Sequence, residues 1–137
     1  MYTELEFINL IIRWMFWSDW GSTPKIERAG MDGSHRRVIL TDSVRWPNGL
    51  TVDFTLDLLY WVDAKLNSIS CANLDGSQHR VILSSRQHLK HPFSVSVFAD
   101  HVYWTEWDTH AIYQAEKFTG SNVTVVTSTD AVIQQCK

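Results

Sequence analysis

Three acidic residues occupy the same place in three similar segments, and their carboxylates are the first candidates for chemistry. Asp19, Asp63 and Glu106 each follow an aromatic pair and one variable residue. A carboxylate could bind a cation or move a proton, but a residue that recurs once in every unit usually serves the unit itself. We therefore expect these acids to accept hydrogen bonds from backbone N–H groups or arginine, between neighbouring units. The segments are Met-Phe-Trp-Ser-Asp-Trp at 15–20, Leu-Tyr-Trp-Val-Asp-Ala at 59–64 and Val-Tyr-Trp-Thr-Glu-Trp at 102–107.

Other patterns for catalysis or metal binding are missing from the sequence. Cys71 and Cys136 belong neither to a Cys-x-x-Cys pair nor to a Cys/His cluster with metal-ligand spacing. The Gly-x-Ser-x-Gly motif of hydrolases is also absent. We therefore predict a protein that is not an enzyme and that needs no cofactor and no metal. The two cysteines could form one disulfide; the alternative is a buried thiol at Cys71 and an unpaired one near the C-terminus.

The composition is that of a core-forming chain with an excess of tryptophan. Of 137 residues, 45% are hydrophobic, 20% are charged and seven are tryptophan, with a formal net charge of −3. This charge argues against nonspecific nucleic-acid binding, which needs a basic surface. The acidic start does not resemble a secretory signal, and the apolar run 7–17 is interrupted by Arg13 and too short to span a bilayer. We expect no direct membrane insertion by these residues.

The chain is built from three copies of one unit of about 43 residues. Three independent markers keep this period, which is the signature of a repeat architecture. The markers and their motif residues are expected to be structural. They are Trp17, Trp61 and Trp104; Ile26, Ile69 and Ile112; and Gly33, Gly76 and Gly120, together with Asp19, Tyr60, Asp63, Tyr103 and Glu106.

Each copy is predicted to contain four antiparallel strands. An apolar segment (50–54 or 95–98) precedes the aromatic strand, and an alternating strand follows it. The Asp-Gly or Thr-Gly step then supplies the positive φ that a hairpin turn needs. The alternating strands are 25–29, 68–72 and 111–115, and the closing strands are 37–40, 80–83 and 123–126.

Four short strands in 40 to 50 residues make one blade of a β-propeller. The predicted fold is therefore all-β, a partial β-propeller of about three four-stranded blades. Propellers close with roughly four to eight blades, so three blades leave the ring open. A WD40 propeller is the alternative, but Trp107-Asp108 occurs once and no Gly-His is present. The expected boundaries are an atypical segment 1–14, in which 8–11 could supply a strand, blades at about 15–46, 47–91 and 92–126, and a tail 127–137.

These markers resemble the YWTD, or low-density lipoprotein (LDL) receptor class B, repeats. The likeness covers about residues 15–126 and includes Trp-Pro-Asn-Gly at 46–49, His-Pro-Phe at 91–93 and Lys-Phe-Thr-Gly at 117–120. It is nearest to the second half of the propeller in LDL, very-low-density lipoprotein (VLDL) and lipophorin receptors and LDL-receptor-related proteins. The resemblance implies a six-bladed ring followed by an EGF-like module in a single-pass endocytic receptor. It places this chain on the extracellular or endosomal-lumen side and implies protein partners: cysteine-rich receptor modules, an EGF-like module and lipoprotein or other protein ligands.

Residues that break the repeat are the better functional candidates. Trp20 has Ala64 and Trp107 as its counterparts, and Trp46 aligns with His91. All of them flank strand ends, so they are expected to share one rim of the disc, where tryptophan clusters are typical binding hot spots. The resemblance implies that Trp20, Trp46 and His91 help to dock the receptor's own cysteine-rich modules at acid pH.

The docking residues of the family are only partly present. A family histidine falls at Asn67 and a family lysine at Gln87, with Lys90 close by. Because histidine titrates in the endosomal range, the hypothesis is that lowering the pH to about 5.5 tightens module binding through His91. Asn122-Val-Thr124 is a predicted N-glycosylation site. The remaining histidines named here are expected to be ordinary surface residues: His35, His79, His101 and His110.

Three functions are weighed. The first is a module of an endocytic lipoprotein receptor that serves ligand uptake and acid-dependent release. The second is a module of a signalling or matrix-binding receptor, with a Wnt-antagonist or laminin-type partner. The third, a catalytic propeller, has no supporting motif.

Overall fold

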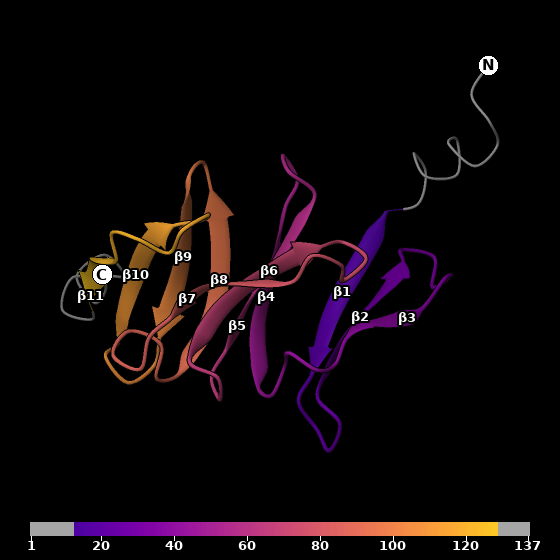
Figure 1. The fold of residues 1–137 in the computed structure, drawn as a ribbon, viewed down its shortest axis with the longest axis horizontal. Coiled ribbons are helices and arrows are strands. Elements are labelled where there is room, and N and C mark those ends of the chain that lie inside the picture. The colour runs from indigo at the N-terminus through magenta and orange to yellow at the C-terminus, as the bar shows by residue number, and fades with distance from the viewer. Residues whose placement is uncertain (1–12, 129–137) are drawn as a thin grey trace, which may run out of the picture.

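The computed structural model describes residues 13–128, which form three antiparallel sheets and, within that range, no helix. The sheets follow one another along the chain and fan out side by side (Figure 1). We call them blades 1, 2 and 3. Blade 1 contains β1 (Trp14–Asp19), β2 (Lys25–Gly30) and β3 (Arg37–Leu40). Blade 2 contains β4 (Pro47–Asp53), β5 (Leu58–Asp63), β6 (Ser68–Asn73) and β7 (Arg80–Ser84). Blade 3 contains β8 (Pro92–Phe98), β9 (His101–Glu106), β10 (Ala111–Glu116) and β11 (Thr124–Ser128).

This architecture confirms the predicted all-β partial propeller. Within each blade the strands pair in chain order, as in β4-β5-β6-β7. The predicted segments fall within the observed strands to within one or two residues, and β11 continues to Ser128. The first blade has three strands among the described residues, and the strand expected at 8–11 lies outside them.

The repeated glycine and isoleucine markers have local structural reasons. Gly33, Gly76 and Gly120 all have positive φ, at 84°, 88° and 66°, which confirms the predicted turn conformation. Each marker isoleucine stands where the pairing with the outermost strand shifts register, as between Ile69 and Ser70. The same shift occurs after Ile26 and after Ile112. A recurring bulge of this kind bends and twists the blade at a fixed place.

The hydrophobic core lies between the blades and not within them. One cluster joins blade 1 to blade 2, where Trp61 packs with Ile26 and Leu40. The other joins blade 2 to blade 3, where Tyr60 packs with Trp104. The two aromatic residues of the blade 2 motif therefore point to opposite neighbours, because successive strand residues face opposite sides of a sheet.

The innermost strands of blades 2 and 3 approach each other closely. A Cβ atom added to Gly49 of β4 would lie 2.8 Å from the carbonyl oxygen of Phe93 in β8. Only glycine allows the two backbones to come so near. Asn48 adds a hydrogen bond from its side-chain amide to the Pro92 carbonyl oxygen at 2.8 Å. The Pro-Asn-Gly sequence at 47–49 thus fixes how blade 3 packs against blade 2.

Candidate functional site

The candidate site is one rim of the blades, defined by Trp20, Trp46, His91 and Trp107 and here called the Trp/His rim. Trp20 follows the end of β1, Trp46 and His91 precede β4 and β8, and Trp107 follows β9. The pairing of Pro47 with Asp63 and of Pro92 with Glu106 puts these positions at the same end of their blades. The three tryptophan side chains are 61%, 43% and 64% exposed, which is unusual for so large an apolar group.

His91 and Trp107 form the most organised part of the rim. Nδ1 of His91 lies 2.9 Å from Oδ1 of Asp108, and the backbone N–H of Trp107 donates to the His91 carbonyl oxygen at 3.1 Å. The ring of Phe93 meets the Trp107 ring edge to face at 5.7 Å. These residues and Asn48 line a hollow of about 280 Å³. Sequence reasoning missed Asp108 as a partner of His91, because the two are 17 residues apart and meet only across the β8–β9 pair.

Trp46 and Trp20 sit on separate blades of the same rim. The ammonium group of Lys65 lies 5.0 Å from the centre of the Trp46 ring, within the range of a cation–π contact. Lys65 was not predicted, and the exposed Lys90 has no such contact given by the structure. Trp20 and Trp17 line a hollow of about 500 Å³, and Arg36 also lines this hollow. The rim therefore presents a row of separate aromatic sites, with His91 and Trp107 together.

The recurring acids hold the backbone that carries the rim. Asp63 is fully buried and accepts hydrogen bonds from the backbone N–H groups of Arg45 at 2.7 Å and Lys65 at 3.0 Å, as well as from Trp46 and Leu66. Glu106, also buried, accepts the N–H groups of His91 at 2.9 Å and Asp108 at 3.2 Å. These bonds fix the start of the innermost strand and the turn after the aromatic strand. Their donors lie in the segment that leads from the preceding blade into the acid's own blade and in the turn that follows the acid.

Asp19 differs from its two counterparts. It is exposed and accepts the N–H of Gly21, two residues further on, at 2.9 Å. Asp63 accepts hydrogen bonds from the segment that contains Arg45 and Trp46. The corresponding segment of blade 1 would precede residue 13, outside the described range. The same motif position thus has a different environment in blade 1.

One histidine prediction is wrong. His79 is not an ordinary surface residue, because its ring stacks on Trp61 with the centres 5.4 Å apart and its Nε2 is buried. Burial lowers the pKa of His79. In blade 1 the same position is Arg36, whose guanidinium lies 5.2 Å from the Trp17 ring centre. In blades 1 and 2, the residue 18 or 19 positions after the motif tryptophan therefore covers the indole ring, a contact that only the structure reveals.

A buried ion pair joins blades 2 and 3 on the side away from the rim. Nζ of Lys117, after β10, lies 2.6 Å from Oδ2 of Asp53, at the end of β4, and both side chains are buried. The hydroxyl of Tyr60 donates to the Lys117 carbonyl oxygen at 3.2 Å, and burial raises the pKa of Tyr60 to about 12. Sequence reasoning used Lys117 only as a turn residue, since nothing local marks a partner 64 residues away.

The remaining candidate groups are Cys71, Cys136 and Asn122. Cys71 is a buried free thiol whose pKa burial raises, and Cys136 lies outside the described residues. Asn122 is exposed in the β10–β11 turn and donates its amide to Glu116 at 2.6 Å. Across the part of the chain that the structure describes, no three histidine, cysteine or acidic side chains gather as a metal site. No helix in that part is long and apolar enough to cross a membrane.

Comparison of the sequence with protein families finds three matches to the low-density lipoprotein receptor repeat class B family, at residues 13–54, 57–98 and 100–135. Among curated proteins, the vitellogenin receptor Yl of Drosophila melanogaster is 54% identical over 55 residues. Low-density lipoprotein receptor-related protein 8 of Gallus gallus is 53% identical over 47 residues. These alignments cover 40% and 34% of this chain, but only 3% and 5% of the relatives.

Solved structures give the same fold. A structure of a nidogen/laminin complex is similar with a TM-score of 0.70 and 30% identity, covering 80% of this chain and 42% of that chain. A luciferin-regenerating enzyme matches with a TM-score of 0.64 at 14% identity, covering 80% of this chain and 40% of that chain. At that identity the second likeness concerns the fold alone. In both cases the chain spans less than half of the structure it matches.

Proposed function

Since the chain belongs to the low-density lipoprotein receptor repeat class B family, we propose that it is a non-enzymatic protein-docking module from the extracellular or endosomal part of an endocytic receptor. The family is a receptor propeller type, and the relatives are lipoprotein and vitellogenin receptors. The Trp/His rim is the docking surface in this proposal. Its partners are cysteine-rich modules of the receptor itself, which compete there with protein ligands.

The observation that carries the proposal is the row of exposed tryptophans beside an exposed histidine–carboxylate pair. Exposed aromatic anchors supply most of the binding energy in many protein interfaces. Here the backbone that carries Trp46 and His91 is fixed by the buried Asp63 and Glu106, so these anchors are held ready for a partner. Preorganised anchors lose less conformational freedom on binding.

His91 is the proposed pH-sensitive contact. Its ring faces Asp108 at 2.9 Å, and its backbone N–H is held by Glu106, with Lys90 next in sequence. Imidazole groups ordinarily gain a proton between about pH 7 and pH 5. A protonated His91 would be neutralised in part by Asp108 and would offer its second N–H to an acidic partner. Acidification then strengthens docking of the receptor's own modules and displaces the ligand.

The test measures binding of a tandem pair of cysteine-rich receptor modules to the immobilised chain at about pH 7.4 and about pH 5.5. We expect at least about fivefold tighter binding at the lower pH, a change of about 1 kcal/mol. His91→Ala should remove this pH dependence, and Trp46→Ala should weaken binding at both pH values. His35→Asn is the matched control, because His35 lies in the β2–β3 turn at the other end of blade 1, and asparagine tolerates its φ of 54°.

Equal affinity at both pH values would refute the acid-dependent part of the proposal. Unchanged binding in Trp46→Ala and in Trp107→Ala would refute the rim as the docking surface. A second candidate function, a matrix-binding module, is favoured by the likeness to the nidogen/laminin complex. Binding of a laminin fragment, without binding of cysteine-rich modules, would favour that alternative.

A further inference from the structure

The chain covers several of its tryptophan rings with its own cations. The Arg28 guanidinium lies 4.0 Å from the centre of the Trp14 ring, and the Lys65 ammonium lies 5.0 Å from that of Trp46. Both distances are within the range of a cation–π contact. Trp107 is 64% exposed, and no lysine or arginine of the described residues lies over its ring. The face of Trp107 is therefore open to a cation that comes from another molecule.

The turn after the buried acid carries opposite charges in blades 2 and 3. In blade 2, Lys65 stands two residues after Asp63 and contacts Trp46, which precedes the innermost strand. In blade 3, the residue two positions after the buried acid is Asp108, and it contacts His91, the counterpart of Trp46. Blade 2 thus completes a cation–aromatic contact from its own residues, whereas blade 3 places a carboxylate next to an exposed tryptophan.

Trp107 and Phe93 form a corner of two aromatic rings, whose planes meet at 72° with the ring centres 5.7 Å apart. Together with Asp108 they are here called the aromatic corner. Both rings are more than half exposed, so a side chain of a partner can reach them. Two small hollows adjoin the corner, of about 280 and 330 Å³. The first is also lined by Asn48, His91 and Asp108, and the second by Thr105, Glu106 and His110.

The fixed charges at the aromatic corner are negative. Asp108 and Glu106 supply two carboxylates, and no lysine or arginine of the described residues lines either hollow. Lys90, next to His91 in sequence, is exposed and lines neither hollow. Glu106 is buried and accepts the backbone N–H groups of His91 and Asp108, so it holds the corner in place. The Asp108 side chain is 42% exposed, and its carboxylate is the one that a bound cation meets.

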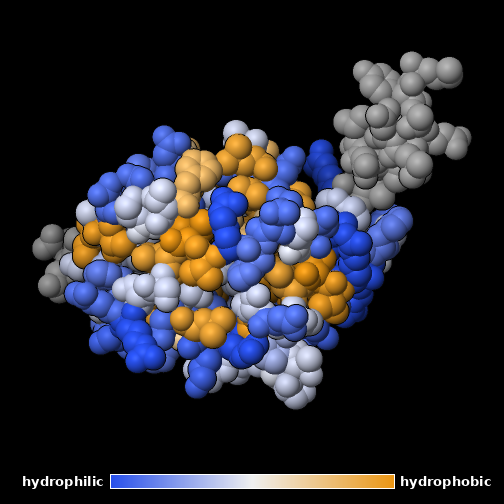
Figure 2. Space-filling model, in the orientation of Figure 1, coloured by the Kyte–Doolittle hydropathy of each residue, from blue (hydrophilic) through white to orange (hydrophobic). Residues whose placement is uncertain are grey.

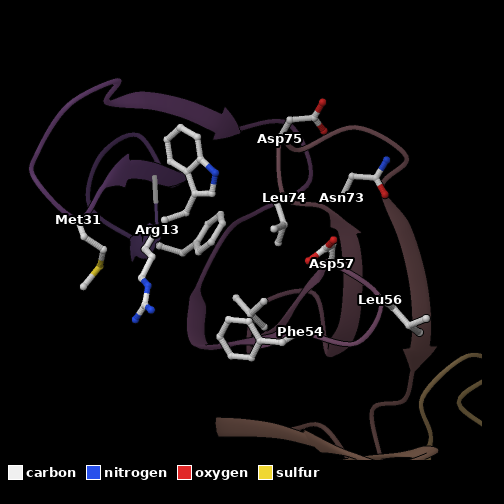
Figure 3. Close-up of a pocket in the computed structure, with 11 residues that line it drawn as sticks. Arg13, Met31, Phe54, Leu56, Asp57, Asn73, Leu74 and Asp75 are labelled. Atoms are coloured by element: carbon white, nitrogen blue, oxygen red, sulfur yellow. The ribbon is translucent and has the colours of Figure 1, made fainter. Parts of the chain in front are cut away.

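A larger cleft of about 900 Å³, between blades 1 and 2, differs from the aromatic corner in its charge. Figure 3 shows Arg13 and Met31 on one side of this cleft and Phe54 and Leu74 on the other. The cleft therefore already contains a cation of the chain itself. On the molecular face seen in Figure 2, hydrophobic residues form separate areas with hydrophilic residues between them. This surface favours recognition through individual side chains over recognition through one broad apolar interface.

We propose that the aromatic corner binds a basic side chain, lysine or arginine, of a protein ligand at neutral pH. The ammonium or guanidinium group lies against the rings of Trp107 and Phe93 and pairs with the Asp108 carboxylate. Cation–π contacts and charge-assisted hydrogen bonds both favour such a group at this place. The inference rests on the proposed function, because it names the chemistry by which a protein ligand competes with cysteine-rich modules at the rim.

Acidification weakens the binding of a basic side chain at the same place. A protonated His91 sets a positive charge 2.9 Å from the Asp108 carboxylate and so competes with the bound cation for it. The charged or titratable groups around His91 are Asp108, Glu106, His110 and Lys90, and blade 2 contributes the neutral Asn48. Protonation of either histidine adds positive charge at the corner. A basic ligand residue is therefore released under the acid conditions in which the rim binds cysteine-rich modules.

The test titrates the full chain with Nα-acetyl-lysine N-methylamide at about pH 7.4 and follows the indole N–H signal of Trp107 by NMR. The signal is assigned by its absence in Trp107→Leu. The matched probe is the norleucine analogue, which lacks the ammonium group. We expect the lysine probe to bind at least about fivefold more tightly than the norleucine probe, since the cation–π contact and the exposed ion pair act together. At about pH 5.5 the affinity for the lysine probe should fall at least about threefold, and His91→Asn should remove most of this fall.

Two variants of the aromatic corner have matched controls elsewhere in blade 3. Phe93→Leu and Asp108→Asn should each weaken binding of the lysine probe at least about threefold, because each removes one component of the site. The controls are Phe98→Leu and Asp100→Asn, which should keep the affinity of the original chain. Phe98 also lies on β8 and is 74% exposed, but at the end away from the rim, and Asp100 is exposed in the turn that follows. Far-UV circular dichroism of each variant checks that the blades remain folded.

Several results would overturn the proposal. Equal affinity for the lysine and norleucine probes would do so, as would an affinity that neither Phe93→Leu nor Asp108→Asn changes. Tighter binding of the lysine probe at the lower pH would contradict release by acid. Docking of cysteine-rich modules without binding of the lysine probe would refute the cation site and leave the proposed function standing. Binding of the lysine probe without any docking of modules would refute the proposed function and leave the cation site standing.

Discussion

Lys117→Met is expected to be among the most destabilising conservative changes in blades 2 and 3. Lys117 and Asp53 form an ion pair of 2.6 Å whose side chains are only 7% and 5% exposed. Methionine keeps the length of the side chain but leaves the buried Asp53 carboxylate with backbone N–H donors alone, those of Thr55, at 3.0 Å, and Leu56. Removing one member of a buried pair costs about 3–5 kcal/mol, because the other charge stays desolvated.

Urea unfolding measures this loss. With an m-value of about 2 kcal/mol/M, a cost of about 4 kcal/mol moves the midpoint down by about 2 M. The double variant Asp53→Asn with Lys117→Met removes both charges and should recover to within about 1 kcal/mol of the original chain. That recovery distinguishes a lost ion pair from lost packing, because packing losses would add in the double variant.

The pH dependence gives an independent check. Burial alone would raise the pKa of Asp53, but the hydrogen bonds from Lys117 and Thr55 outweigh it, and the pKa is lowered. A carboxyl whose folded pKa lies below its unfolded value of about 3.9 stabilises the fold above that pH. The contribution is lost as the pH falls through the folded pKa. The original chain should therefore keep this stabilisation at about pH 5.5 and lose it only in stronger acid.

Lys25→Met is the control for this prediction. Its Nζ lies 3.8 Å from Glu27, at a more exposed site, so its loss should cost about 1 kcal/mol or less. A cost of less than about 1 kcal/mol for Lys117→Met would refute the reasoning. Strict additivity of Asp53→Asn and Lys117→Met would refute it equally, since the two groups would then not be coupled.

Two further outcomes are expected from groups buried between the blades. The phenol of Tyr60 should ionise only at about pH 12, so a spectrophotometric titration should show a late step well above the ordinary tyrosine value of about 10; the absence of this late step would contradict the burial of Tyr60. In a Cys136→Ser variant, Cys71 should resist a thiol reagent until urea unfolds the chain, because burial raises its pKa and closes access. Rapid labelling in water would contradict this expectation.

Much of the fold could be predicted from the sequence because the repeat sets it locally. Trp61 and Trp104 mark the same strand in successive units, and the Asp-Gly steps force positive φ wherever they occur. The alternation of apolar residues then gives the strand faces. The rim could also be predicted, since Trp46 and His91 precede strands at the same end of their blades.

The contacts that cross between strands and blades could not be predicted in this way. The pairing of Lys117 with Asp53, of His91 with Asp108 and of Lys65 with Trp46 depends on side chains brought together by the fold. No local spacing in the sequence predicts these three contacts. The stacking of His79 on Trp61 had one counterpart in the sequence, because Arg36 occupies the same repeat position and contacts Trp17. The change from arginine to histidine between the two repeats made this shared position hard to recognise.

The open face of blade 1 is not a plain copy of the internal faces, and the difference bears on how a neighbouring blade would pack there. Tyr113 of blade 3 packs in the apolar cluster against blade 2, but its counterpart in blade 1 is Glu27. Glu27 accepts hydrogen bonds from Trp17 at 3.2 Å and from Arg36 at 3.2 Å, and the Arg36 contact is the main cause that lowers its pKa. A neighbouring blade must bury this ion pair, and desolvation of the charges offsets much of the gain from covering Trp17. A blade that packs on the open face of blade 1 should therefore gain less stability than blades 1, 2 and 3 gain from the junctions between them.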